Sequence, residues 1–354
     1  QIGTATPDHV IRTKQKPLLL NPKYLNEPEK LRKEISNALE EYKKNYHKYF
    51  KANVQSKGID KKELDPLPRI ILVAGLGLVA IGKSVKETKV AADIYQHTID
   101  IIRKSFDIGQ FAPLKDNDLF DMEYWSLEQA KLGKNKPAAA QGKIVYITGA
   151  ASGIGLATAE LFAKNGASLF LVDLDKEALT VEVKKLRKQF KIGIVSQVMD
   201  VTDEKAVKES FEHLTKKFGG LDILISNAGN AIRGKIGEVD SAILRKSFEL
   251  NFFAHQTLAS QAVQLFQKQK TGGVLMFNAS KAAFNPGKDF GPYALPKAGV
   301  IALMKQYAID YGKDGIRSNA VNADRIRTKL FTKEVLAERS SARGLTPDEY
   351  FKSN

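Results

Sequence analysis

Two stretches of the chain differ in how apolar and polar residues alternate along them. In the first, helical periodicity covers residues 26–50 and 85–106, with a short apolar run at 69–74 between them. In the second, which starts near residue 142, short apolar runs alternate with helical stretches. Strands that alternate with helices in this way are typical of a parallel sheet covered by helices on both faces.

The second stretch therefore predicts an α/β fold of the Rossmann-like, doubly wound type, and the first predicts a smaller N-terminal α/β region. Small residues and a proline at 133–141 indicate a linker, so we predict one domain at 1–135 and another at 136–354. Each predicted strand of the second domain ends near a polar or small residue, where an open α/β sheet binds ligands. These strands are 142–148, 168–173, 192–199, 221–226, 273–278 and 318–321.

Composition narrows the choice of partners. The chain has 354 residues, a formal net charge of +15 and no cysteine, which excludes disulfides and thiolate metal sites. Its lysines are scattered along amphipathic helices, which indicates a lysine-rich surface and no nucleic-acid partner, although an anionic substrate such as a sugar phosphate stays open. No apolar run approaches the roughly 20 residues that cross a bilayer, and no signal peptide is visible. We therefore expect a cytoplasmic protein without a membrane partner, and Gln1 as first residue suggests a piece of a longer chain.

A glycine-rich turn at 75–84 matches two phosphate-binding patterns. The spacing of its glycines fits a dinucleotide turn, and its end, Gly82-Lys83-Ser84, fits a phosphate loop. Residues 78–81 include β-branched side chains, which disfavour the backbone that a phosphate loop needs, and no later apolar strand ends in an aspartate for magnesium. We interpret this segment as a buried strand, a turn and a helix.

Other side chains of the first stretch are interpreted as structural. The tyrosines and the phenylalanine within 42–50 form an apolar seam on the predicted helix, beside lysines that face solvent. Asp121 and Glu123 have no catalytic neighbours in the sequence, so we place them at the surface or in an interface.

A second glycine-rich turn, Gly149–Gly155, follows a strand and precedes a helix. Glycines let the backbone approach a pyrophosphate, and the start of the helix offers free N–H groups to it. Asp173 ends the next strand about twenty residues later, where a carboxylate binds the ribose hydroxyls of NAD and repels the 2′-phosphate of NADP. The turn and the acid together predict NAD as the cofactor.

Acid–base chemistry is indicated by Tyr293 and Lys297, which share one face of a helix because they are four residues apart. A nearby ammonium stabilises a phenolate and lowers a pKa that starts near ~10, so the phenol can act as acid or base near neutral pH. Ser280 can orient a substrate oxygen, and Asn251 can hold a water that passes protons to Lys297. Each residue also has a structural interpretation, as a chance pair, a turn residue or a helix cap, and His255 is interpreted as a packed or surface histidine.

In this order and spacing the motifs resemble the short-chain dehydrogenase/reductase family over roughly residues 140–330. The resemblance implies a seven-stranded Rossmann-like sheet, hydride transfer between a nicotinamide and a small alcohol or carbonyl compound, and a homo-oligomer, either dimer or tetramer. It implies Tyr293 as general acid/base and Lys297 as its pKa modifier and ribose ligand. It also implies that Ser280 polarises the substrate and that Asn251 completes a proton relay. The cofactor-binding residues that it implies are Gly149, Ser152, Gly153, Ile154, Gly155, Asp173, Asp200, Val201, Asn227, Ala228, Gly229, Tyr293 and Lys297.

Three departures from the family pattern are visible. Residues 322–324 are Asn-Ala-Asp where the family often has Pro-Gly, in a loop that borders the substrate. Pro296 lies inside the Tyr–Lys motif and is tolerable only near the start of a helix. The seventh strand, with its late glycine pair, is missing from the chain.

The N-terminal third resembles bifunctional proteins in which a class II, zinc-dependent aldolase of the rhamnulose-1-phosphate type is fused to a short-chain dehydrogenase. The resemblance lies in Thr6–Lys14, Gly75–Ser84 and Asp121–Lys131. His9 is a candidate ligand in such a module, but a zinc site needs three or four ligands and no His-x-His pair is present, so we predict no metal site and a packed or capping His9. We predict an NAD-dependent oxidoreductase of carbohydrate metabolism that acts on a sugar-derived substrate. The alternative is a lyase whose catalytic half lies upstream, with this portion as a scaffold.

Overall fold

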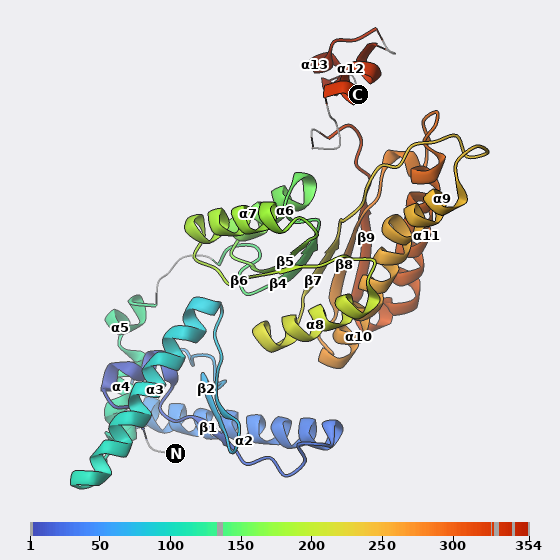
Figure 1. Cartoon of the computed structure of the whole chain (residues 1–354). Helices are drawn as coiled ribbons and strands as arrows, with labels where there is room; N and C mark the ends of the chain where they lie inside the picture. Colours follow the sequence, from blue (N-terminus) through green and yellow to red (C-terminus); the bar gives the residue numbers. More distant parts are fainter. Residues whose placement is uncertain (1–2, 133–136, 327, 329–332, 342–343, 353–354) are drawn as a thin grey trace. The chain divides into compact units, whose positions relative to one another are not determined.

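The computed structural model describes residues 3–132, 137–326, 328, 333–341 and 344–352 (Figure 1). The chain separates into two compact units, Gln1–Pro137 and Ala138–Asn354. Within the described ranges, no helix combines the length and the apolar character needed to cross a membrane.

The first unit is built on a three-stranded sheet between two long helices (Figure 1). β1 (Leu18–Leu20) runs parallel to β2 (Ile70–Val73), and β3 (Gly77–Ala80) runs antiparallel to β2. Apolar residues of α2 (Pro28–Lys57) pack on one face of the sheet, and those of α3 (Val85–Ile108) pack on the other. The unit is completed by η1 (Pro7–His9), α1 (Val10–Thr13), α4 (Asp116–Tyr124) and α5 (Ser126–Ala130).

Helix α2 differs from its predicted limits at both ends. Its N-cap is Glu27 and its first residue is Pro28, so the helix begins two residues after the predicted start at 26. The helix continues beyond residue 50 to Lys57, and Gly58 ends it in the left-handed region at φ +60°. Glycine reaches this conformation without the steric penalty of a Cβ, which fixes the end of the helix.

The glycine-rich segment 75–84 contains the second strand of a β-hairpin, β3, which corrects the predicted turn, while the predicted strand before it and the helix after it are present as β2 and α3. Leu78 pairs with Leu72 and Ala80 pairs with Ile70, so the middle of the segment is extended strand. Ser84 then caps α3 by accepting a hydrogen bond from the backbone N–H of Glu87 at 3.2 Å. A paired strand followed by a capped helix leaves no phosphate-binding loop here.

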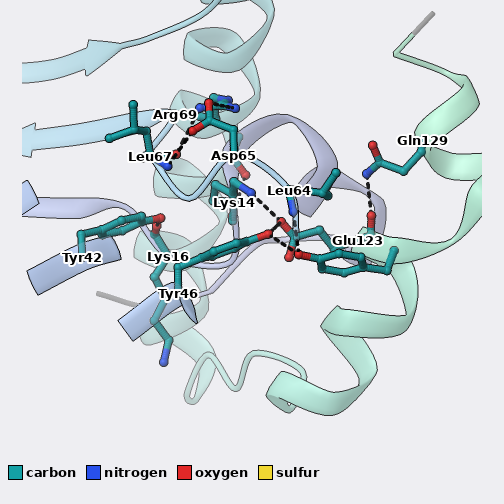
Figure 2. A network of polar contacts seen from close by, with 12 residues as sticks. Lys14, Lys16, Tyr42, Tyr46, Leu64, Asp65, Leu67, Arg69, Glu123 and Gln129 are labelled. Atoms are coloured by element: carbon teal, nitrogen blue, oxygen red, sulfur yellow. Dashed lines mark hydrogen bonds and ion pairs between the residues drawn. The ribbon is translucent and has the colours of Figure 1, made fainter. Parts of the chain in front are cut away.

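A buried polar network joins the helices of the first unit (Figure 2). Lys14 Nζ donates to Glu123 Oε1 at 2.9 Å and lies 3.9 Å from the centre of the Tyr46 ring. The Tyr46 hydroxyl donates to the same carboxylate oxygen at 2.8 Å and lies 2.9 Å from the Tyr124 hydroxyl. Glu123 is 1% exposed, so its predicted place at the surface or in an interface is wrong. The carboxylate is tolerated there because an ammonium and a hydroxyl compensate its charge.

The second unit contains a six-stranded parallel sheet in the order β6-β5-β4-β7-β8-β9. Its strands are β4 (Ile144–Thr148), β5 (Ser168–Asp173), β6 (Ile194–Val198), β7 (Ile223–Ser226), β8 (Gly273–Asn278) and β9 (Ile316–Val321). The strand order reverses at β4, because β5 and β7 pair with opposite edges of it. This topology confirms the predicted Rossmann-like, doubly wound fold, and it places the reversal where such sheets bind ligands.

Alternate side chains of the strands face two separate cores. Tyr146 belongs to the core on the side of α8 (Glu204–Phe218), α10 (Ala254–Gln269) and α11 (Gly291–Tyr311). Its neighbours Val145 and Ile147 belong to the core on the other side, with α6 (Gly153–Lys164) and α7 (Lys176–Gln189) (Figure 1). Because both faces are covered, the strands are nearly continuous apolar runs, and the polar side chains are concentrated at the strand ends.

Candidate functional site

A cavity of about 970 Å³ opens at the carboxyl ends of the strands in the second unit. The loops that follow β4, β5, β6, β7 and β8 all contribute to its wall. Its lining includes most of the predicted site residues: Gly149, Ser152, Gly153, Ile154, Asp173, Asp200, Val201, Asn227, Ala228, Gly229, Ser280, Tyr293 and Lys297. The other two predicted residues, Gly155 and Asn251, are buried and do not line the cavity.

The glycine turn after β4 is shaped by close backbone approaches. Gly149 has φ +63°, and a Cβ on Gly155 would lie 2.0 Å from the Gly149 carbonyl oxygen. Only glycine fits at 155, because the first turn of α6 packs directly on the end of β4. Ser152 is the N-cap of α6, but its side chain makes no capping bond. The first N–H groups of α6 are therefore available to an anion in the cavity.

Two carboxylates line the cavity. Asp173 Oδ2 accepts a hydrogen bond from the Ala151 backbone N–H at 2.9 Å, and its Oδ1 accepts one from the Asp175 N–H at 3.0 Å. Asp200 Oδ1 accepts from the backbone N–H and the hydroxyl of Thr202 at 2.9 and 2.7 Å. The backbone thus holds one acid at the end of β5 and another after β6, both on the cavity wall.

Asn227 connects three strand ends at the floor of the cavity. Its Nδ2 donates to the Thr148 carbonyl at 2.8 Å, and its Oδ1 accepts from Asn278 Nδ2 at 2.8 Å. Its own N–H and that of Ala228 donate to Thr148 Oγ1 at 2.9 and 3.0 Å. The side chain is therefore fully used in tying β4, β7 and β8 together, which fixes the relative positions of the loops after them.

Ser280, Tyr293 and Lys297 line the same cavity as the glycine turn. Ser280 follows β8 and caps the short helix η3 (Lys281–Ala283), where its Oγ accepts from the Ala282 N–H at 3.2 Å. Tyr293 and Lys297 lie on one face of α11, with Lys297 Nζ 5.9 Å from the centre of the Tyr293 ring. A phenol, an ammonium and a hydroxyl therefore face one cavity, as their spacing predicted.

Burial dominates the electrostatics of this group. It raises the pKa of Tyr293, and a hydrogen bond with Ser280 acts in the opposite direction. The expected net lowering of the Tyr293 pKa is therefore absent in the protein alone, because removing water destabilises the phenolate. Burial also lowers the pKa of Lys297 to about 7, which brings it close to neutral pH.

Asn251 lies in a π-helical turn, η2 (Glu249–Phe253), between α9 (Ser241–Phe248) and α10. Its Oδ1 accepts from the Asn230 N–H at 3.1 Å, and its Nδ2 donates to the Asn230 carbonyl at 3.0 Å. A Cβ on Gly229 would lie 2.8 Å from Asn251 Oδ1 and 3.4 Å from Lys297 Nζ. The Asn251 amide thus connects the loop after β7 to η2 by two hydrogen bonds, close to the buried ammonium of Lys297.

Pro296 removes one backbone hydrogen bond from α11, and a side chain supplies the missing donor. Proline has no N–H to donate to the carbonyl of residue 292. The Ser247 hydroxyl donates to that carbonyl at 2.6 Å, and Ser247 Oγ accepts from Asn251 Nδ2 at 3.1 Å. Ser247 thus links the helix of Tyr293 to Asn251, which explains why Pro296 is tolerated beyond the first turn.

Replacing Ser247 by alanine is expected to lower the free energy of unfolding of the second unit by about 1–3 kcal/mol, because the buried Pro292 carbonyl loses its donor. In a Pro296→Ala background, the N–H of residue 296 can donate to that carbonyl, so the same change should have a smaller effect. Urea unfolding followed by circular dichroism measures the four variants of this cycle. Equal losses in the two backgrounds would contradict the link.

The sequence interpretation missed Ser247 and did not identify the contacts of His255. His255 is buried, with Nδ1 2.6 Å from Ser226 Oγ and Nε2 3.2 Å from Lys297 Nζ. It is a packed histidine, as one of the two interpretations had it, but its packing partner is the ammonium of the site. Ser247, Asn251 and His255 are spaced four residues apart, and this spacing is the signal that could have found them.

The loop with Asn-Ala-Asp at 322–324 borders the cavity. The Ala323 carbonyl accepts from the Lys281 N–H at 3.0 Å, and Asp324 Oδ2 lies 3.2 Å from Lys281 Nζ. The residues that depart from the family pattern therefore fix the position of Lys281, which follows Ser280 in the chain.

His9 is the candidate metal ligand of the first unit. Among its described residues, no three His, Asp or Glu side chains are grouped so as to hold a metal ion. His9 is half-buried, and its Nδ1 has no hydrogen-bond partner.

Comparison with known proteins assigns the two units separately. Residues 1–132 match the family model for the second domain of class II aldolases, and residues 143–339 match the model for short chain dehydrogenases. These matches confirm that the N-terminal third resembles class II aldolases and that the second part of the chain resembles short-chain dehydrogenases. An uncharacterized oxidoreductase of Bacillus subtilis, YuxG, is 32% identical over 99% of this chain, which spans about half of that relative's length (51%). A 3-oxoacyl-[acyl-carrier-protein] reductase of Thermotoga maritima is 34% identical over 54% of the chain and 78% of its own length.

Solved structures resemble the second unit. Carveol dehydrogenase from Mycobacterium avium, in complex with NAD, has a TM-score of 0.55 and 25% identity over 57% of this chain and 78% of its own. L-sorbose reductase from Gluconobacter frateurii, with NADPH and L-sorbose, has a TM-score of 0.54 and 32% identity over 59% of this chain and 78% of its own. These two relatives contain different nicotinamide cofactors.

Proposed function

Because the chain belongs to the short-chain dehydrogenase family of nicotinamide-dependent oxidoreductases, we propose that it interconverts an alcohol and a carbonyl on a small sugar-derived substrate with NAD. One observation carries the proposal: Ser280, Tyr293 and Lys297 line the same cavity as the glycine turn. A group that donates and accepts protons thus faces the place where a dinucleotide would bind.

The cavity has the features that a nicotinamide dinucleotide needs. The uncapped start of α6 offers N–H groups to a pyrophosphate, and Gly155 leaves the space that a Cβ would fill. Asp173 and Asp200 lie at the strand ends where the adenosine half would sit. When bound, NAD would supply the hydride acceptor, and the reacting carbon would lie beside Tyr293.

The chain's own residues would position the substrate and move the proton. In the oxidation direction, the phenolate oxygen of Tyr293 accepts the hydroxyl proton of the alcohol as hydride leaves its carbon. The Lys297 ammonium stabilises that phenolate, and the Ser280 hydroxyl donates a hydrogen bond to the substrate oxygen. Asn251 holds the loop after β7 and thereby the wall beside Lys297.

Asp173 is expected to select NAD over NADP. Its carboxylate is held by hydrogen bonds from two backbone N–H groups beside the glycine turn. A 2′-phosphate would therefore be repelled by a negative charge whose position is fixed. We expect NADH to bind on the order of 100-fold more tightly than NADPH, which corresponds to about 2.7 kcal/mol. In Asp173→Ser, the two dissociation constants should differ by less than about fivefold, measured by titration of nicotinamide fluorescence.

Asp175→Ser is the matched control for this change. Asp175 lies two residues away and caps α7 by accepting from the Ala178 N–H at 2.9 Å, but it does not line the cavity. Its loss should weaken the helix and leave the ratio of the two dissociation constants unchanged. Tighter binding of NADPH by the unaltered protein would refute the choice of NAD.

Two observations support a sugar-derived substrate. The chain shares 32% identity with an L-sorbose reductase, and its first unit matches an aldolase domain. The test is NADH formation by the purified chain over a panel of polyols, ketoses and short hydroxyaldehydes, each also offered as its carbonyl partner with NADH. Turnover confined to polyhydroxylated compounds is the expected result. If the protein neither binds NAD(H) nor oxidises any alcohol, the proposed function is wrong.

A further inference from the structure

Lys297 is a buried cation that lacks a carboxylate partner. It is 2% exposed, and among the described residues no Asp or Glu forms an ion pair with it. Its Nζ donates to the Asn278 carbonyl at 2.8 Å and contacts His255 Nε2 at 3.2 Å. A buried ammonium without a counter-ion depends on neutral acceptors, so each of these two contacts matters for its charge.

The tautomer of His255 follows from its two contacts. With Lys297 charged, its ammonium can only donate, so we assign His255 Nε2 as the acceptor and the ring proton to Nδ1. Nδ1 then donates to Ser226 Oγ at 2.6 Å, at the end of β7. Burial and the neighbouring Lys297 charge both lower the pKa of His255 well below its usual range, which keeps the imidazole neutral and able to accept.

Resting on the proposed function, we propose that His255, oriented by Ser226, is a positioning residue that holds Lys297 in its charged form and so keeps Tyr293 active as a base. The other groups facing Lys297 are the Tyr293 phenol on α11, the Asn278 carbonyl on β8, and the amide of Asn251 on η2. His255 on α10 and Tyr293 are therefore the titratable groups that face the ammonium from the described elements around it.

Removing the acceptor should shift the pH profile upward. Without His255 Nε2, the ammonium of Lys297 is less stable, so the pKa of Lys297 falls. The phenolate then loses a positive neighbour at a given pH, so the apparent pKa of the coupled pair, read as the acidic limb of kcat/KM for alcohol oxidation, rises. One charge-assisted hydrogen bond corresponds to a shift of about one pH unit, and to about tenfold lower kcat/KM on the acidic side of the profile.

The test compares His255→Leu with His255→Gln in the full chain. The leucine variant should show the upward shift of about one pH unit, while NADH affinity stays within about threefold. Glutamine can place Oε1 where Nε2 was, so it should restore the limb to within about 0.3 pH unit. His213→Leu is the matched control, because His213, on α8, is half-buried against Phe170 of β5 and Gln197 of β6 and does not line the cavity. An unchanged limb in His255→Leu, or identical limbs in the leucine and glutamine variants, would overturn the proposal.

A second measurement needs no turnover and separates this inference from the proposed function. In protein labelled with ¹⁵N-histidine, imidazole NMR at pH 6 should show His255 neutral, with its proton on Nδ1. A proton on Nε2, or an imidazolium, would overturn the proposal even in an active enzyme. If His255→Leu does not fold, Ser226→Ala replaces it in the kinetic test and should shift the limb upward by a smaller amount, because the ring loses the acceptor that fixes its tautomer. A chain with the expected NMR signature but no dehydrogenase activity would refute the proposed function alone.

Discussion

Replacing Tyr293 by phenylalanine is expected to lower kcat/KM for alcohol oxidation by about 10²–10⁴-fold, which is the usual contribution of a positioned acid or base. The Tyr293 hydroxyl forms a hydrogen bond with Ser280, and phenylalanine removes it while keeping the ring, whose centre lies 5.7 Å from that of Phe290. NADH affinity should change by less than about threefold, because the cofactor half of the cavity is untouched. Steady-state kinetics with the best substrate of the panel measure the first value, and fluorescence titration measures the second.

Tyr307→Phe provides a control on the same helix. Tyr307 is also buried on α11, but its hydroxyl donates to the Gln256 carbonyl at 3.3 Å, outside the cavity. Its loss should leave kcat/KM within about twofold. Full activity in Tyr293→Phe, or an equal loss in both variants, would contradict the proposed acid–base role.

Replacing Glu123 by glutamine is expected to destabilise the first unit by about 3–5 kcal/mol, because it leaves the Lys14 ammonium buried without a counter-charge. The side chains of Lys14 and Glu123 are 6% and 1% exposed, and burial already lowers the pKa of Lys14 while Glu123 opposes that shift (Figure 2). The chain has a single tryptophan, Trp125, directly after α4. Its fluorescence during urea unfolding therefore reports on this unit alone.

The ion pair between Lys57 and Asp121 is the matched control. Its N–O distance is also 2.9 Å, but Asp121 is 61% exposed, so Asp121→Asn should change the stability by no more than about 1 kcal/mol. The double variant Lys14→Met, Glu123→Gln should recover part of the stability, because no unpaired charge remains. Equal effects of Glu123→Gln and Asp121→Asn would show that the buried pair contributes no more to the free energy of unfolding than the exposed pair.

The sequence was sufficient for features that depend on local periodicity. The six strands of the second unit are buried on both faces, so each appears as an apolar run, and the glycine turn and Asp173 lie at strand ends. The predicted doubly wound sheet follows directly from this pattern. The glycine turn, Asp173 and Ser280 lie near one another in turn, because the carboxyl ends of parallel strands meet at one edge.

What the sequence could not show depends on contacts between distant segments. Glu123 appears as a surface residue until Lys14 and Tyr46 are brought against it from other helices. Segment 75–84 was predicted as a turn, because its glycine spacing does not reveal that Leu78 pairs with Leu72 in a strand. The raised pKa of Tyr293 is likewise a result of burial, which the spacing of two residues on one helix does not reveal.

The Ser247 hydroxyl donates to the Pro292 carbonyl in place of the N–H that Pro296 lacks. This compensation has a consequence for the divergence of homologues. Serine at 247 and proline at 296 compensate for one another, so a lineage that loses one should lose or restore the other at nearly the same time. Homologues with an ordinary donor at position 296 are free to place an apolar side chain at 247. The two positions, nearly fifty residues apart in the chain, should therefore covary as a pair even though neither lines the cavity.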